Sequence, residues 1–64
     1  MSEQELIEWG RRELQLRMTE LEAVKSPADL EQAQANAEQR RRAGKLTRNQ
    51  AFNAIKAARR ANRL

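Results

Sequence analysis

The residue types that could bind a ligand gather in the C-terminal part of the chain, from Gln39 to Leu64. This stretch holds nine Lys or Arg residues and no Asp or Glu. Such a density of cations can neutralise phosphates and release their counterions, which supplies most of the affinity in nucleic-acid binding. Asn and Arg can also contact base edges from a helix in the major groove, and guanidinium groups can stack on unpaired bases. The stretch therefore predicts a nucleic-acid-binding surface.

The spacing within this stretch places cations, amides and one ring on one side of a helix. Positions spaced i, i+4, i+7 and i+11 form one line and are occupied by Phe52, Lys56, Arg59 and Arg63. The neighbouring lines add further cations and two amides. The predicted nucleic-acid-binding residues are Arg40, Arg41, Arg42, Lys45, Arg48, Asn49, Asn53, Lys56, Arg59, Arg60 and Arg63.

The same cations could also serve roles that involve no nucleic acid. Arginines in the last turn of a helix suit the negative end of its dipole. The acidic N-terminal part could neutralise the basic surface through Glu8, Glu13, Glu20 and Glu22. The alternative function is a protein–protein module that docks on an acidic protein surface through charge complementarity, as an inhibitor or adaptor of a host protein or a nucleic-acid enzyme. The predicted partner-binding residues for that function are Trp9, Leu16 and Phe52.

The distribution of charge along the chain is uneven. Residues 1–38 carry nine acids and four bases, a net charge of −5, whereas residues 39–64 carry a net charge of +9. The overall charge is +4. A split of this kind bears on the choice of partner rather than on the fold.

Composition argues against catalysis and against a metal or cofactor. The chain has no cysteine and no histidine, so it lacks disulfides and the usual zinc ligands. It has no Gly-rich phosphate loop, Ser2 and Ser26 are predicted helix caps, and the acids are spaced as exposed helix positions. We therefore expect a non-enzymatic regulatory or accessory protein without cofactors.

Length and hydropathy limit the architecture and the location. The 64 residues suffice for one small domain, 1–64. No apolar run approaches the ~18 residues of a membrane span, and the N-terminus does not resemble a secretory signal. We expect a cytoplasmic protein with no membrane partner, and the size and charge suit a phage or plasmid regulator.

Capping signals predict three helices, at about 2–25, 27–43 and 48–62. Ser2 with Glu5 and Thr47 with Gln50 have the capping-box spacing. Ser26 is the predicted N-cap of the second helix, Pro27 its first residue, and Asp29 fills the acid position of the capping box with a shorter side chain than Glu. Gly44 is predicted to be the left-handed residue that stops the second helix. The expected fold is all-α: a small bundle or helical hairpin, which a homodimer could complete because the large apolar residues are few.

Apolar periodicity assigns faces to these helices. A stripe formed by Ile7, Leu14, Met18 and Leu21 is the predicted core face of the first helix. A second line, Trp9, Leu16 and Ala23, indicates a second neighbour, which is either another helix of the chain or a second chain. The packing side of the third helix is predicted to be Ala51, Ala54, Ile55, Ala58 and Ala61. Phe52 is expected at the edge of the core, and Gly10 is either a site of close helix approach or simply tolerated.

Overall fold

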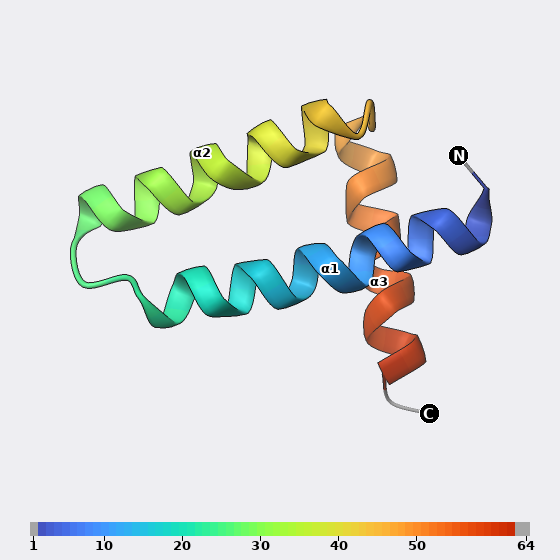
Figure 1. The fold of residues 1–64 in the computed structure, drawn as a ribbon, viewed down its shortest axis with the longest axis horizontal. Coiled ribbons are helices and arrows are strands. Elements are labelled where there is room, and N and C mark those ends of the chain that lie inside the picture. Colours follow the sequence, from blue (N-terminus) through green and yellow to red (C-terminus); the bar gives the residue numbers. More distant parts are fainter. Residues whose placement is uncertain (1, 63–64) are drawn as a thin grey trace.

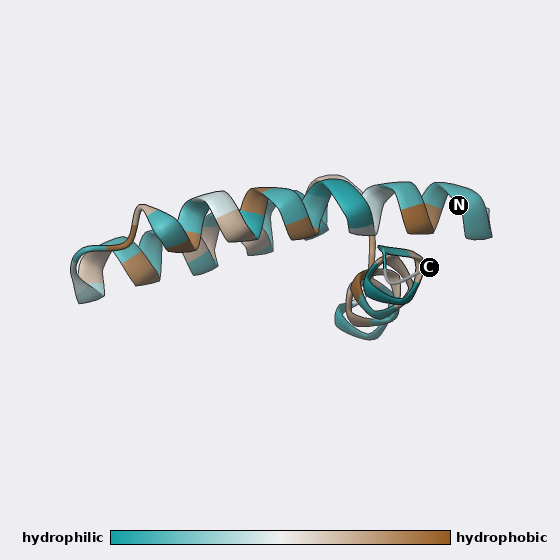
Figure 2. Cartoon of the chain, turned by 90° about the horizontal axis from the view of Figure 1, so that it is seen from below, coloured by the Kyte–Doolittle hydropathy of each residue, from teal (hydrophilic) through white to brown (hydrophobic). Residues whose placement is uncertain are grey.

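The computed structural model describes residues 2–62, and within them it contains three helices: α1 (Glu3–Glu22), α2 (Pro27–Ala43) and α3 (Arg48–Asn62). α1 and α2 run antiparallel as a hairpin, and α3 crosses α1 at a steep angle (Figure 1). Seen edge-on, the hairpin is one thin layer and α3 lies on one side of it (Figure 2). The predicted all-α fold is confirmed, although α1 ends at Glu22 rather than Lys25. No described helix is both long and apolar enough to cross a bilayer.

The predicted caps form at the start of each helix. Ser2 and Glu5 make a reciprocal capping box at α1. At α3, Thr47 N–H donates to Gln50 Oε1 at 2.9 Å, and Gln50 N–H donates to Thr47 Oγ1 at 3.1 Å. These bonds satisfy backbone donors that the first helical turn leaves without partners.

The cap of α2 departs slightly from the prediction. Asp29 N–H donates to Ser26 Oγ at 3.3 Å, as expected for an N-cap serine. A capping box would have the Asp29 carboxylate accept from Ser26 N–H. Instead it accepts from Lys25 N–H, one residue earlier, at 3.0 Å. Both bonds hold the connection between the helices against the first turn of α2.

The prediction that Gly44 is left-handed is wrong by one residue. Gly44 has φ −80° and Lys45 has φ +58°. Lys45 N–H donates to Arg42 O at 3.0 Å and Leu46 N–H donates to Arg41 O at 3.2 Å, the two bonds of a Schellman motif with Lys45 at C′. Gly44 instead permits a close approach, because a Cβ there would lie 3.1 Å from Nε1 of Trp9.

The core lies where α3 crosses α1. A Cβ on Gly10 would lie 2.2 Å from the carbonyl oxygen of Ala54, so only glycine allows the two backbones to meet at this distance. Gly10 therefore serves the close approach and is not merely tolerated. Four of the five predicted packing residues of α3 are buried, and Ala61 is half-buried. The buried apolar residues are Leu46, Ala51, Ala54, Ile55 and Ala58.

The predicted core stripe of α1 is covered only in part. Ile7 and Leu14 are half-buried, whereas Met18 is 56% and Leu21 is 58% exposed. The prediction that Met18 and Leu21 belong to the core is therefore wrong for the single chain. The reason is geometric: α3 crosses α1 near Gly10 instead of lying along it, so the distal half of the hairpin has no third helix over it (Figure 1).

Candidate nucleic-acid interface

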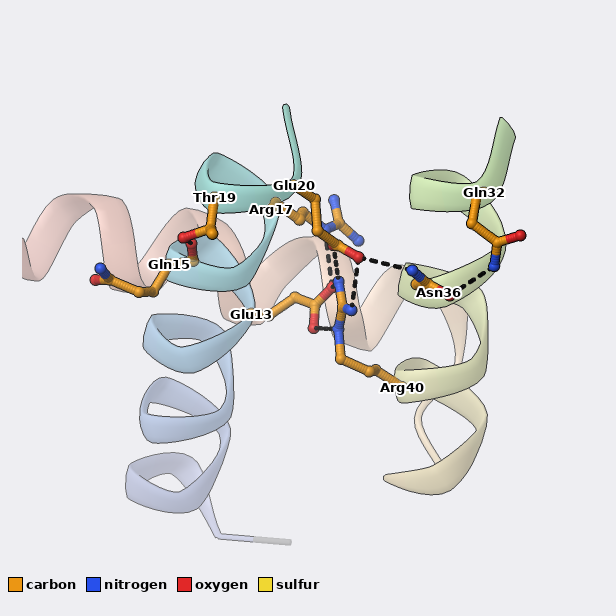
Figure 3. Close-up of polar contacts among 8 residues, drawn as sticks. All are labelled: Glu13, Gln15, Arg17, Thr19, Glu20, Gln32, Asn36 and Arg40. Carbon is orange, nitrogen blue, oxygen red and sulfur yellow. Dashed lines mark hydrogen bonds and ion pairs between the residues drawn. The ribbon is translucent and has the colours of Figure 1, made fainter. Parts of the chain in front are cut away.

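Arg40, one of the predicted binding residues, is engaged inside the chain. Its Nε donates to Oε2 of Glu13 at 2.7 Å, and its Nη2 donates to Oε1 of Glu13 at 3.0 Å. Nη2 and Nη1 also donate to the two carboxylate oxygens of Glu20, at 2.7 and 3.3 Å (Figure 3). Charge-assisted bidentate bonds of this kind are the stronger class of hydrogen bond. The guanidinium lowers the pKa of Glu20, and the two carboxylates raise the pKa of Arg40.

Glu13 is the centre of this network, and the expectation that the acids occupy exposed positions is wrong for it. Its side chain is 2% exposed, and it also accepts from Nε of Arg17 at 3.0 Å. A buried carboxylate needs such partners, since an unpaired charge in the interior is costly. A signal was present in the sequence: Glu13, Arg17 and Glu20 lie between the two apolar lines of α1, on a side that a neighbouring helix can cover. The network joins α1 to α2 (Figure 3).

Arg41 holds the turn between α2 and α3. Its Nη2 forms an ion pair with Glu38, and its Nη1 donates to the carbonyl oxygen of Leu46 at 2.7 Å. The guanidinium of Arg41 lowers the pKa of the Glu38 carboxyl. Arg40 and Arg41 are therefore both engaged in ion pairs and hydrogen bonds within the chain.

The remaining predicted cations within residues 2–62 are exposed. Arg42 and Arg48 are 73% and 83% exposed, and each lies 3.8 Å from Glu38, a long contact for an ion pair. Ion pairs between exposed side chains contribute only about 0–1 kcal/mol. In the same part of the chain, no carboxylate comes within 4.0 Å of Lys45, Lys56, Arg59 or Arg60. The acidic helix α1 thus neutralises Arg40 but not the cations of α3.

We call the exposed residues Arg42, Lys45, Arg48, Asn49, Asn53, Lys56, Arg59 and Arg60 the basic surface. All eight are exposed, and six of them belong to α3, a helix that has no Asp or Glu. Asn49 and Asn53 are one turn apart, so they share one side of the helix. Arg63, the remaining predicted member, lies outside the described residues.

Phe52 stands beside the basic surface and is 62% exposed, more than a position at the edge of the core predicts. Nζ of Lys56 lies 5.4 Å from the centre of its ring, within the range of a cation–π contact. Phe52 also lines a groove of about 300 Å³ between α3 and the hairpin, together with Arg48, Lys56 and Arg59. The Phe52 ring and the side chains of Arg48 and Arg59 thus line the same groove.

The predicted partner residues on α1 are placed differently from Phe52. Trp9 is half-buried, with Nε1 against the Gly44 turn, which gives this side of α1 a neighbour within the chain. Leu16 is 43% exposed. A role for either residue in binding another protein remains a prediction.

Comparison with protein-family models, with curated proteins and with solved structures finds no match to this chain. Function is therefore inferred from the residues and their geometry.

Proposed function

We propose that this chain is a small, non-enzymatic regulatory or accessory protein that binds nucleic acid through the basic surface on α3 and the turn before it. The observation that carries the proposal is the contrast between two sets of cations. Arg40 and Arg41 are paired with Glu13, Glu20 and Glu38. The cations of α3 keep their charge exposed, and phosphates are the common ligand for such a surface.

The shape of the chain supports contact by α3 in particular. α3 stands on one side of the hairpin layer, and its C-terminal half extends past α1 (Figures 1 and 2). Its solvent-facing side combines the cations Lys56 and Arg60 with the amides of Asn49 and Asn53. Cations of this kind position a helix on the phosphate backbone, and amides can bond to base edges.

A binding measurement at several salt concentrations tests the proposal. The full chain is titrated with a labelled duplex and a labelled single strand, and log K is plotted against log of the salt concentration. If about five cations meet phosphates, the slope on duplex DNA is about −4 to −5. No detectable binding to either nucleic acid at low salt would overturn the proposal and favour an acidic protein surface as the ligand of the same cations.

A triple variant and a matched control assign the binding to α3. Lys56→Ala, Arg59→Ala and Arg60→Ala together remove three charges from the basic surface, so binding should weaken strongly and the salt slope should become shallower by about 3. The control removes three exposed charges elsewhere, through Arg11→Ala, Arg12→Ala and Lys25→Ala. Equal losses in the two variants would show that net charge alone, and not the α3 surface, drives binding.

A further inference from the structure

The distal half of the hairpin presents an apolar face that the chain itself leaves open. A groove of about 350 Å³ runs between α1 and α2, and its apolar lining consists of Leu21, Leu30, Ala33 and Ala37. Leu21 is 58% and Leu30 is 40% exposed. Brown, apolar bands continue along the hairpin layer well beyond α3, which crosses it near one end only (Figure 2). We call this face, defined by the four lining residues, the hairpin face.

The chain as a whole exposes more surface than a compact monomer of its mass, enough for a second copy to cover. The accessible surface is 5207 Å², whereas a folded monomer of 7.4 kDa exposes about 4,200 Å². The radius of gyration is 12.1 Å, against about 10.7 Å for a compact domain of this length. The excess surface, about 1,000 Å², is close to the roughly 800 Å² that each partner buries in an interface of standard size.

The charges around the hairpin face restrict the kind of partner. The groove is bordered by two cations and two acids, and every one of them already has an ion-pair partner within the chain: Arg17 with Glu13, Glu20 with Arg40, and Arg41 with Glu38. A nucleic acid or a strongly charged protein would find no unpaired charge to meet here. A surface with an apolar centre and a balanced rim instead suits an identical surface, as in a twofold dimer.

We infer that a second copy of this chain covers the hairpin face, so that two hairpins stack through Leu21, Leu30 and the alanines between them. The inference does not depend on the proposed function. It explains why the periodic apolar stripe of α1 continues to Leu21, which lines the groove and which the single chain leaves 58% exposed. It also gives the protein a larger core than the alanine-based crossing of α1 and α3, because among residues 2–62 the large apolar residues that are fully buried are Ile55 in α3 and Leu46 in the turn before it.

Sedimentation equilibrium of the full wild-type chain is the first test. The expected result is a dimer, with twice the 7.4 kDa of one chain, and a melting temperature that rises with protein concentration. A wild-type chain that stays monomeric up to high micromolar concentration would overturn the inference.

A pair of matched variants locates the interface. Leu21→Glu with Leu30→Glu places two charges on the hairpin face and should shift the equilibrium toward monomer by at least a hundredfold in dissociation constant. The control, Ala35→Glu with Gln39→Glu, adds the same charge at exposed positions of α2 that do not line the groove, and it should remain dimeric. A double leucine variant that stays fully dimeric would refute the assignment of this face.

A further measurement decides the case in which the leucine variants do not fold. Wild-type chain labelled with ¹³C is mixed with unlabelled wild-type chain, and nuclear Overhauser effects between copies are selected by isotope filtering. Effects from the methyl groups of Leu21 and Leu30 to the other copy support the inference. Effects between copies that arise only from residues outside the hairpin face would overturn it.

Discussion

Gly10 of α1 meets the backbone of Ala54 on α3 so closely that a Cβ on Gly10 would lie 2.2 Å from the carbonyl oxygen of Ala54. Backbone atoms cannot rotate away as a flexible side chain can, so a methyl group here must push the two helices apart. We expect Gly10→Ala to lower the free energy of unfolding by at least about 2 kcal/mol, even though alanine favours helix by about 1 kcal/mol. Urea denaturation followed by circular dichroism measures the change.

The second glycine provides the control for Gly10→Ala. A Cβ on Gly44 would lie 3.1 Å from Nε1 of Trp9, a side-chain atom that can shift by a few tenths of an ångström, and Gly44 has a right-handed helical φ of −80°. Gly44→Ala should therefore change the free energy of unfolding by less than about 1 kcal/mol. Equal losses at the two glycines would contradict a special role for the backbone contact.

Lys45 occupies the position where a helix C-terminus prefers glycine. Its φ is +58°, and a left-handed conformation costs a non-glycine residue about 1 kcal/mol. We expect Lys45→Gly to raise the free energy of unfolding by about 0.5 kcal/mol, because the relief of strain exceeds the extra entropy of glycine in the unfolded chain. Thermal melts of this variant and of Lys45→Ala, which keeps the strain but removes the charge, measure the difference. A lower melting temperature for Lys45→Gly than for Lys45→Ala would be inconsistent with strain at this position.

Arg40 and Arg42 lie two positions apart in the sequence, but their substitution should change stability by very different amounts. Arg40→Ala leaves the buried Glu13 without its main partner, and we expect a loss of about 3 kcal/mol in the free energy of unfolding. Arg42→Ala, at a position that is 73% exposed, should cost less than about 0.5 kcal/mol. Chemical denaturation measures both.

Nucleic-acid affinity should show the reverse order. Measured under conditions in which each variant is folded, Arg42→Ala should weaken binding, because it removes a cation from the basic surface. Arg40→Ala should not, since its guanidinium is enclosed by two carboxylates. If Arg40→Ala alone reduced binding, the separation of structural from exposed cations would have to be abandoned.

Acid should destabilise the protein through its ion-paired glutamates. The hydrogen bonds from Arg40 to Glu20 and from Arg41 to Glu38 lower the pKa of each carboxyl below its ordinary value of 4.5. A folded-state pKa below the unfolded one contributes stability that is complete above about pH 4.5 and is lost as pH falls through the lowered values. The free energy of unfolding should therefore be nearly constant from about pH 7 to 5 and decline below about 4.5.

A glutamine variant ties this decline to one residue. Glu20→Gln should reduce stability at neutral pH and make the fall in acid shallower, because the carboxylate that binds Arg40 is gone. Glu22 makes no ion pair with the described residues, so Glu22→Gln serves as the control and should keep the full acid response. An identical pH profile for Glu20→Gln and the wild type would exclude the Arg40 pair as a source of acid sensitivity.

The sequence by itself determined the local structure. Ser2, Ser26 and Thr47 start the three helices because side-chain caps act over three residues and need no distant partner. The alanine-rich packing side of α3 followed from its period of 3.6 residues. The exposed cations of α3 could also be recognised, because no acid lies near them in the chain.

Only the tertiary structure decided which residues are covered and which charges are paired. The crossing at Gly10 depends on the angle between α1 and α3, and that angle leaves Met18 and Leu21 uncovered although they share a stripe with Ile7. The pairing of Arg40 with Glu13 joins residues 27 positions apart, a separation that no local spacing encodes. The same is true of the contact between Gly44 and Trp9, which belongs to another helix. Local bonds are set by neighbours in sequence, whereas burial is set by neighbours in space.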